Sequence, residues 1–325
     1  MERSKTSEDF SLVQVAEGIH VWLAPNGSWG MSNAGLILDG RESMIVDTMF
    51  DLHLTRSMLD AMATVEPQLQ HHVDVLINTH ANGDHCHGNE LVPTGRIIAS
   101  EETSAEMDEL PPSVLSAMVE RFKEDPSSLG RYIQHAFGGF DFSNITMRLP
   151  TETFTNEMLL TVGDIEIRLY EVGPAHTRGD VIAYIPSRNV VFTGDILFNL
   201  ETPIMWSGPV GNWIDACDRI ASFDAITVPG HGPVTDRAGA LEMRNFWVLL
   251  RDQTKERFDA GMGVLDAARD IDLGPYSGWG GTERVFLNVN SLYREFGSEQ
   301  VVQDVMGLFA EMGAIWTLEN DLPAN

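Results

Sequence analysis

Short apolar and alternating segments follow one another through the beginning of the chain. Residues 18–23 alternate between apolar and polar side chains, which is typical of a half-buried strand. Residues 34–38 and 43–47 are almost continuously apolar and predict buried strands, and the second of them ends in Asp47. Asp39-Gly40 lies between them as a hairpin-type turn signal. The pattern therefore predicts a sheet in this part of the chain.

Helical and strand patterns continue along the chain. Residues 52–65 have the apolar spacing of a helix, and residues 73–78 form a short apolar run that predicts a strand. Segment 101–148 is rich in predicted helix and interrupts this order. The later predicted strands are 153–160, 165–172, 181–185, 190–193 and 225–228, and the predicted helices that follow them are 241–258, 264–271, 283–296 and 301–312.

This order predicts an α/β core with two helical additions. We expect the core to extend over residues 1–240 and to contain a helical insertion at about 101–148. We expect residues 241–325 to form a helical extension packed on the core. The apolar faces of the insertion's helices suit packing, a hydrophobic lid or a contact in a homo- or hetero-oligomer.

Composition and charge narrow the classes of partner. The chain has 48 acidic residues against 21 lysines and arginines, and its formal net charge is −27. A surface this negative repels nucleic-acid phosphates and anionic membranes, so we expect neither as a partner and predict a small-molecule substrate. Residues 1–10 lack the apolar core of a signal peptide, and the two cysteines form no disulfide framework. We therefore expect a cytoplasmic protein.

Four short segments each place metal-type ligands directly after a predicted strand. The first segment, 79–89, contains Gly83, which permits a tight backbone turn among its ligands. Imidazole and carboxylate groups are ligands that zinc prefers in proteins. The residues of this type in the four segments are His80, Asp84, His85, His176, Asp195 and His231.

These segments resemble the motifs of the metallo-β-lactamase superfamily, in the same chain order. Segment 79–89 is similar to the H-x-H-x-D-H signature, and the later segments are similar to the later His, the bridging Asp and the last His of that family. The resemblance covers roughly residues 13–240. It implies a four-layered αβ/βα sandwich with metals at one edge, between the two sheets. It also implies a metal-dependent hydrolase that uses a metal-bound hydroxide on a small organic substrate.

The resemblance further implies a role for each ligand. One metal is expected on His80 and His176, a second on Asp84, His85 and His231, and Asp195 is expected to bridge both. Asp84 is in addition expected to act catalytically, by receiving a proton or orienting the hydroxide. The expected cofactor is zinc, with one or two ions per chain and with manganese or iron as alternatives.

Asn82 departs from this signature, because it stands where the family has its second His. An amide oxygen is a neutral and usually poorer zinc ligand than imidazole. Three outcomes follow from the substitution. Asn82 ligates through its oxygen in a two-metal site; or the first site is weak and one metal remains on Asp84, His85 and His231; or the metal preference shifts toward manganese or iron.

Other residues near these segments are candidates for substrate contacts. Trp29 suits stacking on an apolar or aromatic substrate, and equally suits core burial. His87 is a candidate for substrate contact or proton transfer, or for a structural role beside the ligands. Arg178 suits either a substrate anion or a salt bridge to Asp180 or another acid. Cys86 is interpreted as a buried, inert thiol.

The sequence leaves the bond that is cleaved open. An ester, a lactone or another activated C–O bond, including an aryl ether, fits the resemblance. Two alternatives of other classes are an iron-dependent redox enzyme on the same fold and a weakly metallated paralogous subunit of a hetero-oligomer. Asn82 motivates the alternative of a weakly metallated subunit, because an amide in place of the second His weakens the binding of the first metal.

Overall fold

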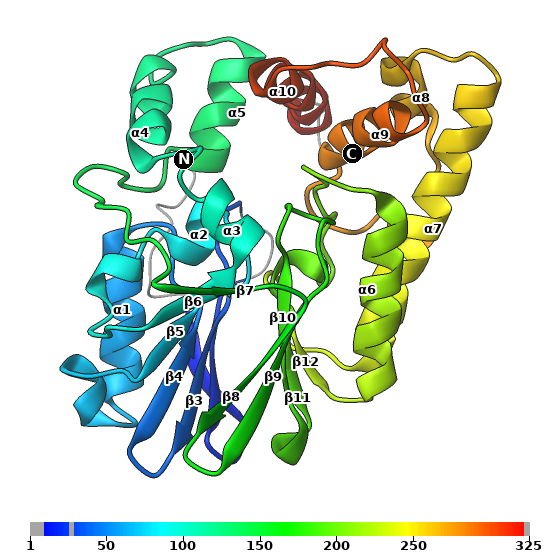
Figure 1. The fold of residues 1–325 in the computed structure, drawn as a ribbon. Coiled ribbons are helices and arrows are strands. Elements are labelled where there is room, and N and C mark those ends of the chain that lie inside the picture. Colours follow the sequence, from blue (N-terminus) through cyan, green and yellow to red (C-terminus); the bar gives the residue numbers. More distant parts are fainter. Residues whose placement is uncertain (1–9, 26–28, 322–325) are drawn as a thin grey trace.

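Two β-sheets form the centre of the protein in the computed structural model, which describes residues 10–25 and 29–321 (Figure 1). The prediction that the N-terminus is not a signal peptide concerns residues that lie almost entirely outside these ranges. The first sheet has seven strands in chain order: β1 (Ser11–Ala16), β2 (Ile19–Leu23), β3 (Ala34–Asp39), β4 (Glu42–Val46), β5 (Val75–Ile77), β6 (Ile97–Ser100) and β7 (Glu152–Phe154). The second sheet has the order β12-β11-β10-β9-β8 and consists of β8 (Glu157–Val162), β9 (Ile165–Glu171), β10 (Val181–Ile185), β11 (Val190–Phe192) and β12 (Ile226–Val228).

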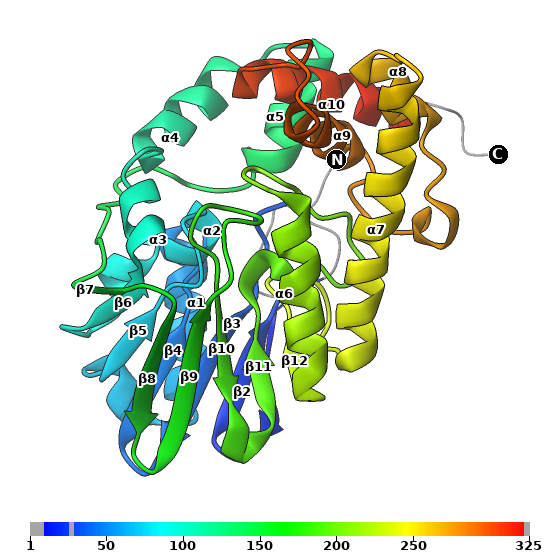
Figure 2. The same ribbon diagram turned by 45° about the vertical axis from the view of Figure 1, so that its right-hand side comes forward.

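Helices cover the outer faces of both sheets, as Figure 2 shows for α1 on one side and α6 and α7 on the other. The helices are α1 (Leu52–Ala63), α2 (Gly83–Cys86), α3 (Glu101–Glu106), α4 (Pro112–Arg121), α5 (Ser128–Phe137), α6 (Val210–Phe223), α7 (Arg237–Asp259), α8 (Val264–Asp270), α9 (Arg284–Glu295) and α10 (Val305–Asp321). Among the described residues, none of these helices has the length and apolar character needed to cross a membrane.

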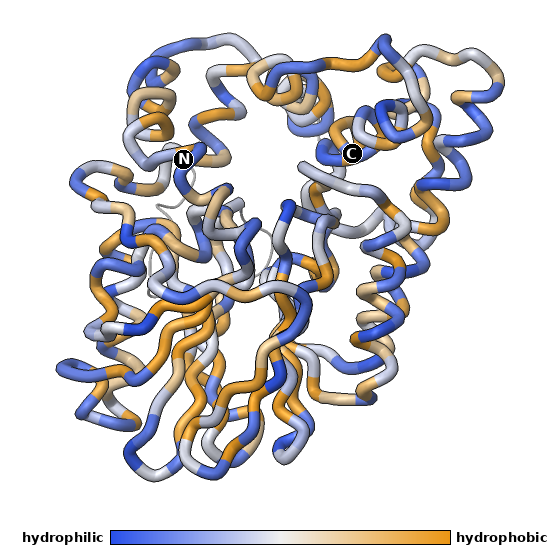
Figure 3. The backbone as a smooth tube through the Cα atoms, viewed as in Figure 1, coloured by the Kyte–Doolittle hydropathy of each residue, from blue (hydrophilic) through white to orange (hydrophobic). Residues whose placement is uncertain are grey.

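The strands bury both of their faces, which explains their nearly continuous apolar runs. Successive side chains of a strand point to opposite faces. Ile37 and Met44 therefore pack against Ile167 of the second sheet, whereas Leu36 and Ile45 belong to the separate core that includes α1. Figure 3 shows the apolar stretches concentrated along the paired strands. This arrangement confirms the expected αβ/βα sandwich.

The predicted strand 153–160 is wrong in one respect, because the structure divides it between the two sheets. β7 pairs in parallel with β6, whereas β8 pairs with β9 in the other sheet. Asn156, with φ 62°, lies at the crossing between them. An αL residue turns the chain abruptly, and Asn tolerates that conformation. Residues 155–157 at this turn are all polar, but the sequence does not show that the strands before and after them join different sheets.

Helix boundaries differ from the prediction mainly at the C-terminal end. α10 begins at Val305 and not at residue 301, because the side chain of Asp304 accepts a hydrogen bond from the Gly307 backbone N–H at 2.8 Å. α7 begins at Arg237, so it crosses the proposed boundary at residue 240 without a break. The division into a core and an extension therefore stays a prediction.

The helical insertion and the C-terminal helices meet above one edge of the sandwich. In Figure 1, α4 and α5 approach this edge from one side, and α8, α9 and α10 from the other. Aromatic side chains join α5 to α10. The ring centres of Tyr132 and Phe309 lie 6.2 Å apart, and His135 stacks on Trp316 with ring centres 4.6 Å apart. The two additions thus form one helical layer over this edge, made of α4, α5, α8, α9 and α10, which we call the roof. The candidate metal ligands lie beneath it.

Candidate metal centre

The predicted ligands gather at the edge of the sandwich where parallel strands end. His80 follows β5, Asp195 follows β11 and His231 follows β12. Asp84 and His85 lie in the short helix α2, and His176 lies in the loop between β9 and β10. Because parallel strands present their carboxyl ends at one edge, residues far apart in sequence meet there. All six side chains are buried, and Asp84 is the most exposed, at 8 %.

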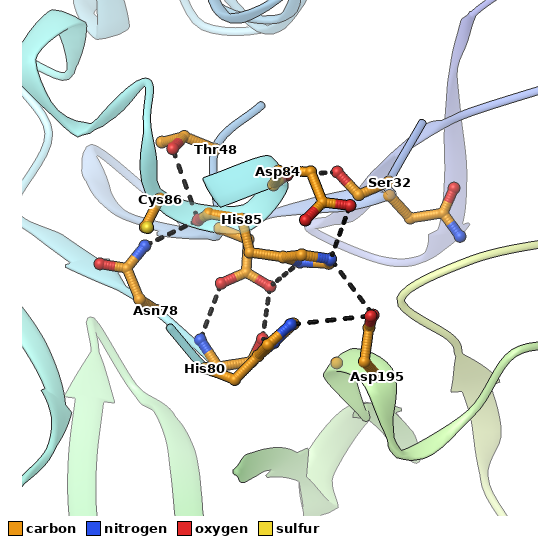
Figure 4. A network of polar contacts seen from close by, with 12 residues as sticks. Ser32, Thr48, Asn78, His80, Asp84, His85, Cys86 and Asp195 are labelled. Carbon is orange, nitrogen blue, oxygen red and sulfur yellow. Dashed lines mark hydrogen bonds and ion pairs between the residues drawn. The ribbon is translucent and has the colours of Figure 1, made fainter. Parts of the chain in front are cut away.

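Asp195 lies at the middle of this cluster, as Figure 4 shows for its approach to His80 and His85. The Nε2 atom of His85 lies 3.2 Å from Asp195 Oδ1. The distances from Asp195 Oδ2 to Nε2 are 3.3 Å for His176, 3.3 Å for His231 and 3.6 Å for His80. Asp84 Oδ2 completes the cluster at 3.3 Å from His231 Nε2. One carboxylate therefore contacts imidazoles that come from both sheets.

Every histidine of the cluster is held through its Nδ1 atom by another group. The Nδ1 partners are Thr79 Oγ1 for His80 at 3.0 Å, Asp47 Oδ2 for His85 at 3.0 Å, Ile204 O for His176 at 2.6 Å and Met31 O for His231 at 3.2 Å. Such contacts set the orientation of the ring and favour a tautomer whose Nε2 lone pair is free for a metal. The four Nε2 atoms consequently point into the same space.

The donor atoms of this cluster fit a metal ion. Among the described residues, the buried Nε2 atoms of His80, His85 and His176 and Oδ1 of Asp195 have no hydrogen-bond partner. Buried polar atoms without partners are costly, and they cluster where a group is missing. Two sets have ligand atoms within 4.8 Å of one another: His80, His85 and Asp195, and Asp84, His85 and His231. The second set is the one that the sequence predicts for one metal.

His80 and His231 differ in the direction in which their surroundings shift the imidazole pKa. Burial and the neighbouring His85 lower the pKa of His80 well below its usual value. Burial also opposes the charge on His231, but the carboxylates of Asp195 and Asp84 outweigh it and raise the pKa of His231 to about 10. Without a metal, the carboxylates thus retain a proton on His231. A metal ion must displace that proton, so metal affinity falls as the pH falls.

Asp47 braces the cluster from the end of β4. Its carboxylate accepts hydrogen bonds from the Thr79 backbone N–H and hydroxyl, each at 2.7 Å, and contacts His85 Nδ1. Its backbone has φ 64°, in the left-handed region that non-glycine residues seldom adopt. Since Thr79 also contacts His80, one carboxylate orients two of the predicted ligands. This agrees with the acid expected at the end of an early strand.

Several supporting residues carry no signal in the sequence. Met31 and Ile204 act through backbone carbonyls, which every residue type possesses. Ser32 donates its hydroxyl to the carbonyl of Asp84, and Asn78 donates to the carbonyl of His85 (Figure 4). Thr79 is the exception, because its place next to His80 could have suggested a contact.

Asn82 lies immediately before α2, and its side chain is half-buried. Its backbone carbonyl accepts a hydrogen bond from His85 N–H at 2.9 Å, but its side chain does not cap the helix. Asn is one of the preferred N-cap residues, but the Asn82 side chain makes no capping hydrogen bond here. Its amide is therefore available for another partner. The geometry leaves the three outcomes for Asn82 open.

The candidate substrate residues lie in different surroundings. His87 is only 3 % exposed and packs against the rings of Phe50 and Phe142. Arg178 pairs with glutamates of the insertion, which supports the expectation of a salt bridge to an acid other than Asp180; its partners are Glu102, Glu106 and Glu109. Cys86 is buried, and burial raises the pKa of its thiol well above its usual value, as an inert thiol requires.

Trp29 lines a cavity of about 170 Å³ under the roof, together with residues of α9 and α10. Its indole N–H donates to Glu283 at 3.3 Å, and its ring packs against Tyr132, Phe137 and Phe309. The loop of Trp29 thus joins the roof to the metal cluster, since Met31 of the same loop contacts His231.

Comparison with known proteins agrees with this geometry. The family model of the metallo-beta-lactamase superfamily matches residues 27–231, and the chain belongs to that superfamily. The type 2 metallo-beta-lactamase of Bacteroides fragilis is 22 % identical over 238 residues, which cover 70 % of this chain and 81 % of the relative. The class of enzyme is accordingly a metallo-hydrolase, as the sequence predicts.

Solved structures show the same fold. The stereoselective inverting sec-alkylsulfatase Pisa1 of a Pseudomonas species superposes with a TM-score of 0.66 at 16 % identity, covering 89 % of this chain and 50 % of the alkylsulfatase. The metallo-beta-lactamase of Pontibacter korlensis superposes with a TM-score of 0.53 at 17 % identity, covering 74 % of this chain and 99 % of that one. The chain thus spans about half the length of the alkylsulfatase. The superfamily typically binds one or two metal ions, usually zinc.

Proposed function

We propose that the protein hydrolyses an ester, a lactone or another activated C–O bond of a small organic molecule, with metal held by the six-residue cluster and by Asn82. The observation that carries this proposal is the set of four histidines with anchored Nδ1 atoms and Nε2 atoms directed at Asp195. Three of these Nε2 atoms, those of His80, His85 and His176, are buried without a hydrogen-bond partner, which favours a bound cation.

The proposed roles of the residues follow from their positions. His80, Asn82 and His176 hold one metal; Asp84, His85 and His231 hold the second; and Asp195 bridges the two. When bound, such ions activate water at neutral pH and polarise the bond that is cleaved. Asp84 is the most exposed member of the cluster, so its carboxylate suits accepting a proton from the attacking water.

The surroundings of the cluster favour a substrate with an apolar or aromatic part. Trp29, Phe137 of α5 and Phe309 of α10 contact one another, and Trp206, from the segment between β11 and α6, contacts Phe309. Aromatic surfaces of this kind bind flat apolar groups. The net charge of −27 disfavours a polyanion.

A sulfate ester belongs among the esters to be tested. The alkylsulfatase superposes on 89 % of this chain and the β-lactamase of Pontibacter korlensis on 74 %. A sulfate monoester carries one charge, so the acidic surface opposes it less than a polyphosphate.

Metal content and hydrolysis measured together test this proposal. The protein is purified without added metal, its metals are quantified by elemental analysis, and aryl esters, lactones, aryl ethers and aryl sulfates are offered as chromogenic substrates. We expect about two zinc or manganese ions per chain and activity that a chelator removes and metal restores. The variant His231→Ala should lose activity and one of the two metals, whereas His53→Gln, on the exposed side of α1, should lose neither. Iron with oxidase activity, or no metal at all, would contradict the proposal.

A further inference from the structure

Four flat groups lie one after another between the roof and the metal cluster. The guanidinium of Arg284 lies 4.4 Å from the centre of the Trp29 ring and 6.0 Å from that of Phe198. Phe198 in turn stacks on His231, with ring centres 5.0 Å apart and an angle of 5° between the planes. A ligand histidine of the proposed metal site is therefore connected to the roof through one phenyl ring and one guanidinium.

Arg284 is held firmly at the start of α9. It is only 4 % exposed, and its Nη1 atom donates to the carbonyl of Thr202 at 2.9 Å and lies 3.7 Å from Glu201 Oε2. A guanidinium is planar and weakly hydrated, so it stacks on aromatic faces better than the ammonium of lysine does. Its attraction to a ring grows when water is excluded, as it is here.

The neighbouring Glu283 fixes the other end of the stack. Its Oε1 atom accepts hydrogen bonds from the indole N–H of Trp29 at 3.3 Å and from the hydroxyl of Tyr132 at 2.9 Å. Trp29 is thus held at its edge by Glu283 and at its face by Arg284. Both residues come from the beginning of α9, so this helix end determines where the loop of Trp29 lies.

Two supports orient His231, and both depend on this arrangement. One is the parallel face of Phe198, whose ring centre lies 6.0 Å from the guanidinium of Arg284. The other is the carbonyl of Met31, which contacts His231 Nδ1 at 3.2 Å and lies two residues after Trp29. The remaining histidines of the cluster take their Nδ1 contacts from other segments.

We infer that Arg284 is a positioning residue for His231, and that it acts through Phe198 and through the loop of Trp29 without touching the metal or the substrate. The inference rests on the proposed function, because it assigns His231 to a metal. Groups that orient a metal ligand typically change metal affinity by about 10- to 100-fold when they are removed. Phe198 also meets the ring of His176, with ring centres 5.6 Å apart, so the loss should be larger for the metal that His231 binds than for the other metal.

Substitutions that keep the buried charges balanced provide the test. Arg284→Met alone leaves Glu201 without its ion pair, so the variant used is Arg284→Met with Glu201→Gln, compared against Glu201→Gln alone. Phe198→Leu removes the stacking ring without changing any charge. Arg251→Gln, at an exposed ion pair with Asp252 on α7, is the matched control.

Metal affinity is measured by titrating the chelator-stripped full-length protein with Zn²⁺ against a coloured competitor. The binding step of the His231 site is the step that disappears in His231→Ala. We expect that step to weaken by about 10-fold or more in Arg284→Met/Glu201→Gln and in Phe198→Leu, and any other step to weaken less. The control Arg251→Gln should keep every metal step and the unfolding midpoint of the wild type. When the two changes are combined, the total loss should be smaller than the product of the separate losses, because Arg284 acts in part through Phe198.

Three results would overturn the inference. The first is an unchanged His231 step in variants that retain their fold by circular dichroism. The second is an equal weakening of every metal step together with a lowered unfolding midpoint, which indicates general destabilisation. The third is a combined loss equal to the product of the separate losses. A wild-type protein that binds no metal would instead contradict the proposed function itself, and with it the role of His231.

Discussion

The burial of His87 predicts a specific loss of stability in mild acid. Its imidazole is 3 % exposed, lies among the rings of Phe50 and Phe142, and makes its contact through Nδ1 to the carbonyl of Phe50 at 3.3 Å. Burial lowers the pKa of His87 from 6.5 to about 4, although the Phe50 carbonyl and the more distant Asp84 oppose this shift. The folded protein therefore keeps this imidazole neutral where the unfolded chain would protonate it.

The size of the effect follows from linkage between proton binding and folding. Between pH 6.5 and 4 the unfolded state binds more protons at this residue than the folded state, so the free energy of unfolding rises with pH in that window. The difference of 6.5 − 4 units, at about 1.4 kcal/mol each, amounts to about 3 kcal/mol in total. The contribution is fully present above pH 6.5, and about 2 kcal/mol of it is lost by pH 5.

Urea unfolding of the chelator-stripped protein at pH 7.5 and pH 5 measures this contribution. In His87→Leu the imidazole is replaced by an apolar side chain of similar size that cannot be protonated. We expect the free energy of unfolding to fall between the two pH values by about 2 kcal/mol more in the wild type than in this variant. His53→Gln, on the exposed side of α1, is the control and should behave as the wild type does. Equal pH dependence in the wild type and His87→Leu would refute the reasoning.

Three further changes test the metal cluster directly. Asp47→Ala removes the acceptor of His85 Nδ1, so metal affinity in a competition titration should fall by about 10- to 100-fold; unchanged affinity would show that Asp47 does not orient the ligand. Gly230→Ala places a Cβ atom 1.9 Å from Asp195 Oδ1, so bound metal, measured by elemental analysis, should be lost while the circular dichroism spectrum is retained. Asn82→His restores an imidazole ligand and should raise the affinity for a second zinc ion; the same stoichiometry and affinity as the wild type would mean that Asn82 does not limit that site.

The sequence by itself determined most of the strands and which side chains gather at one edge of the sandwich. Strands such as β3 and β4 are buried on both faces, so their apolar runs are strong local signals. His80, Asp195 and His231 each follow a strand, and parallel strands bring their carboxyl ends to one edge. These predictions succeeded because spacing along the chain is enough to carry them.

Only the tertiary structure decided how the cluster is supported and covered. Polar residues interrupt segment 153–160, with the αL residue Asn156 among them, but only the strand pairing shows that its two parts belong to different sheets. The carbonyls of Met31 and Ile204 orient ligand histidines, yet any residue type supplies a carbonyl. Arg284 lies 53 positions after His231 in the sequence, and no local pattern relates the two. Such contacts depend on how side chains that are far apart in the sequence pack together. The pattern of neighbouring residues does not contain this information.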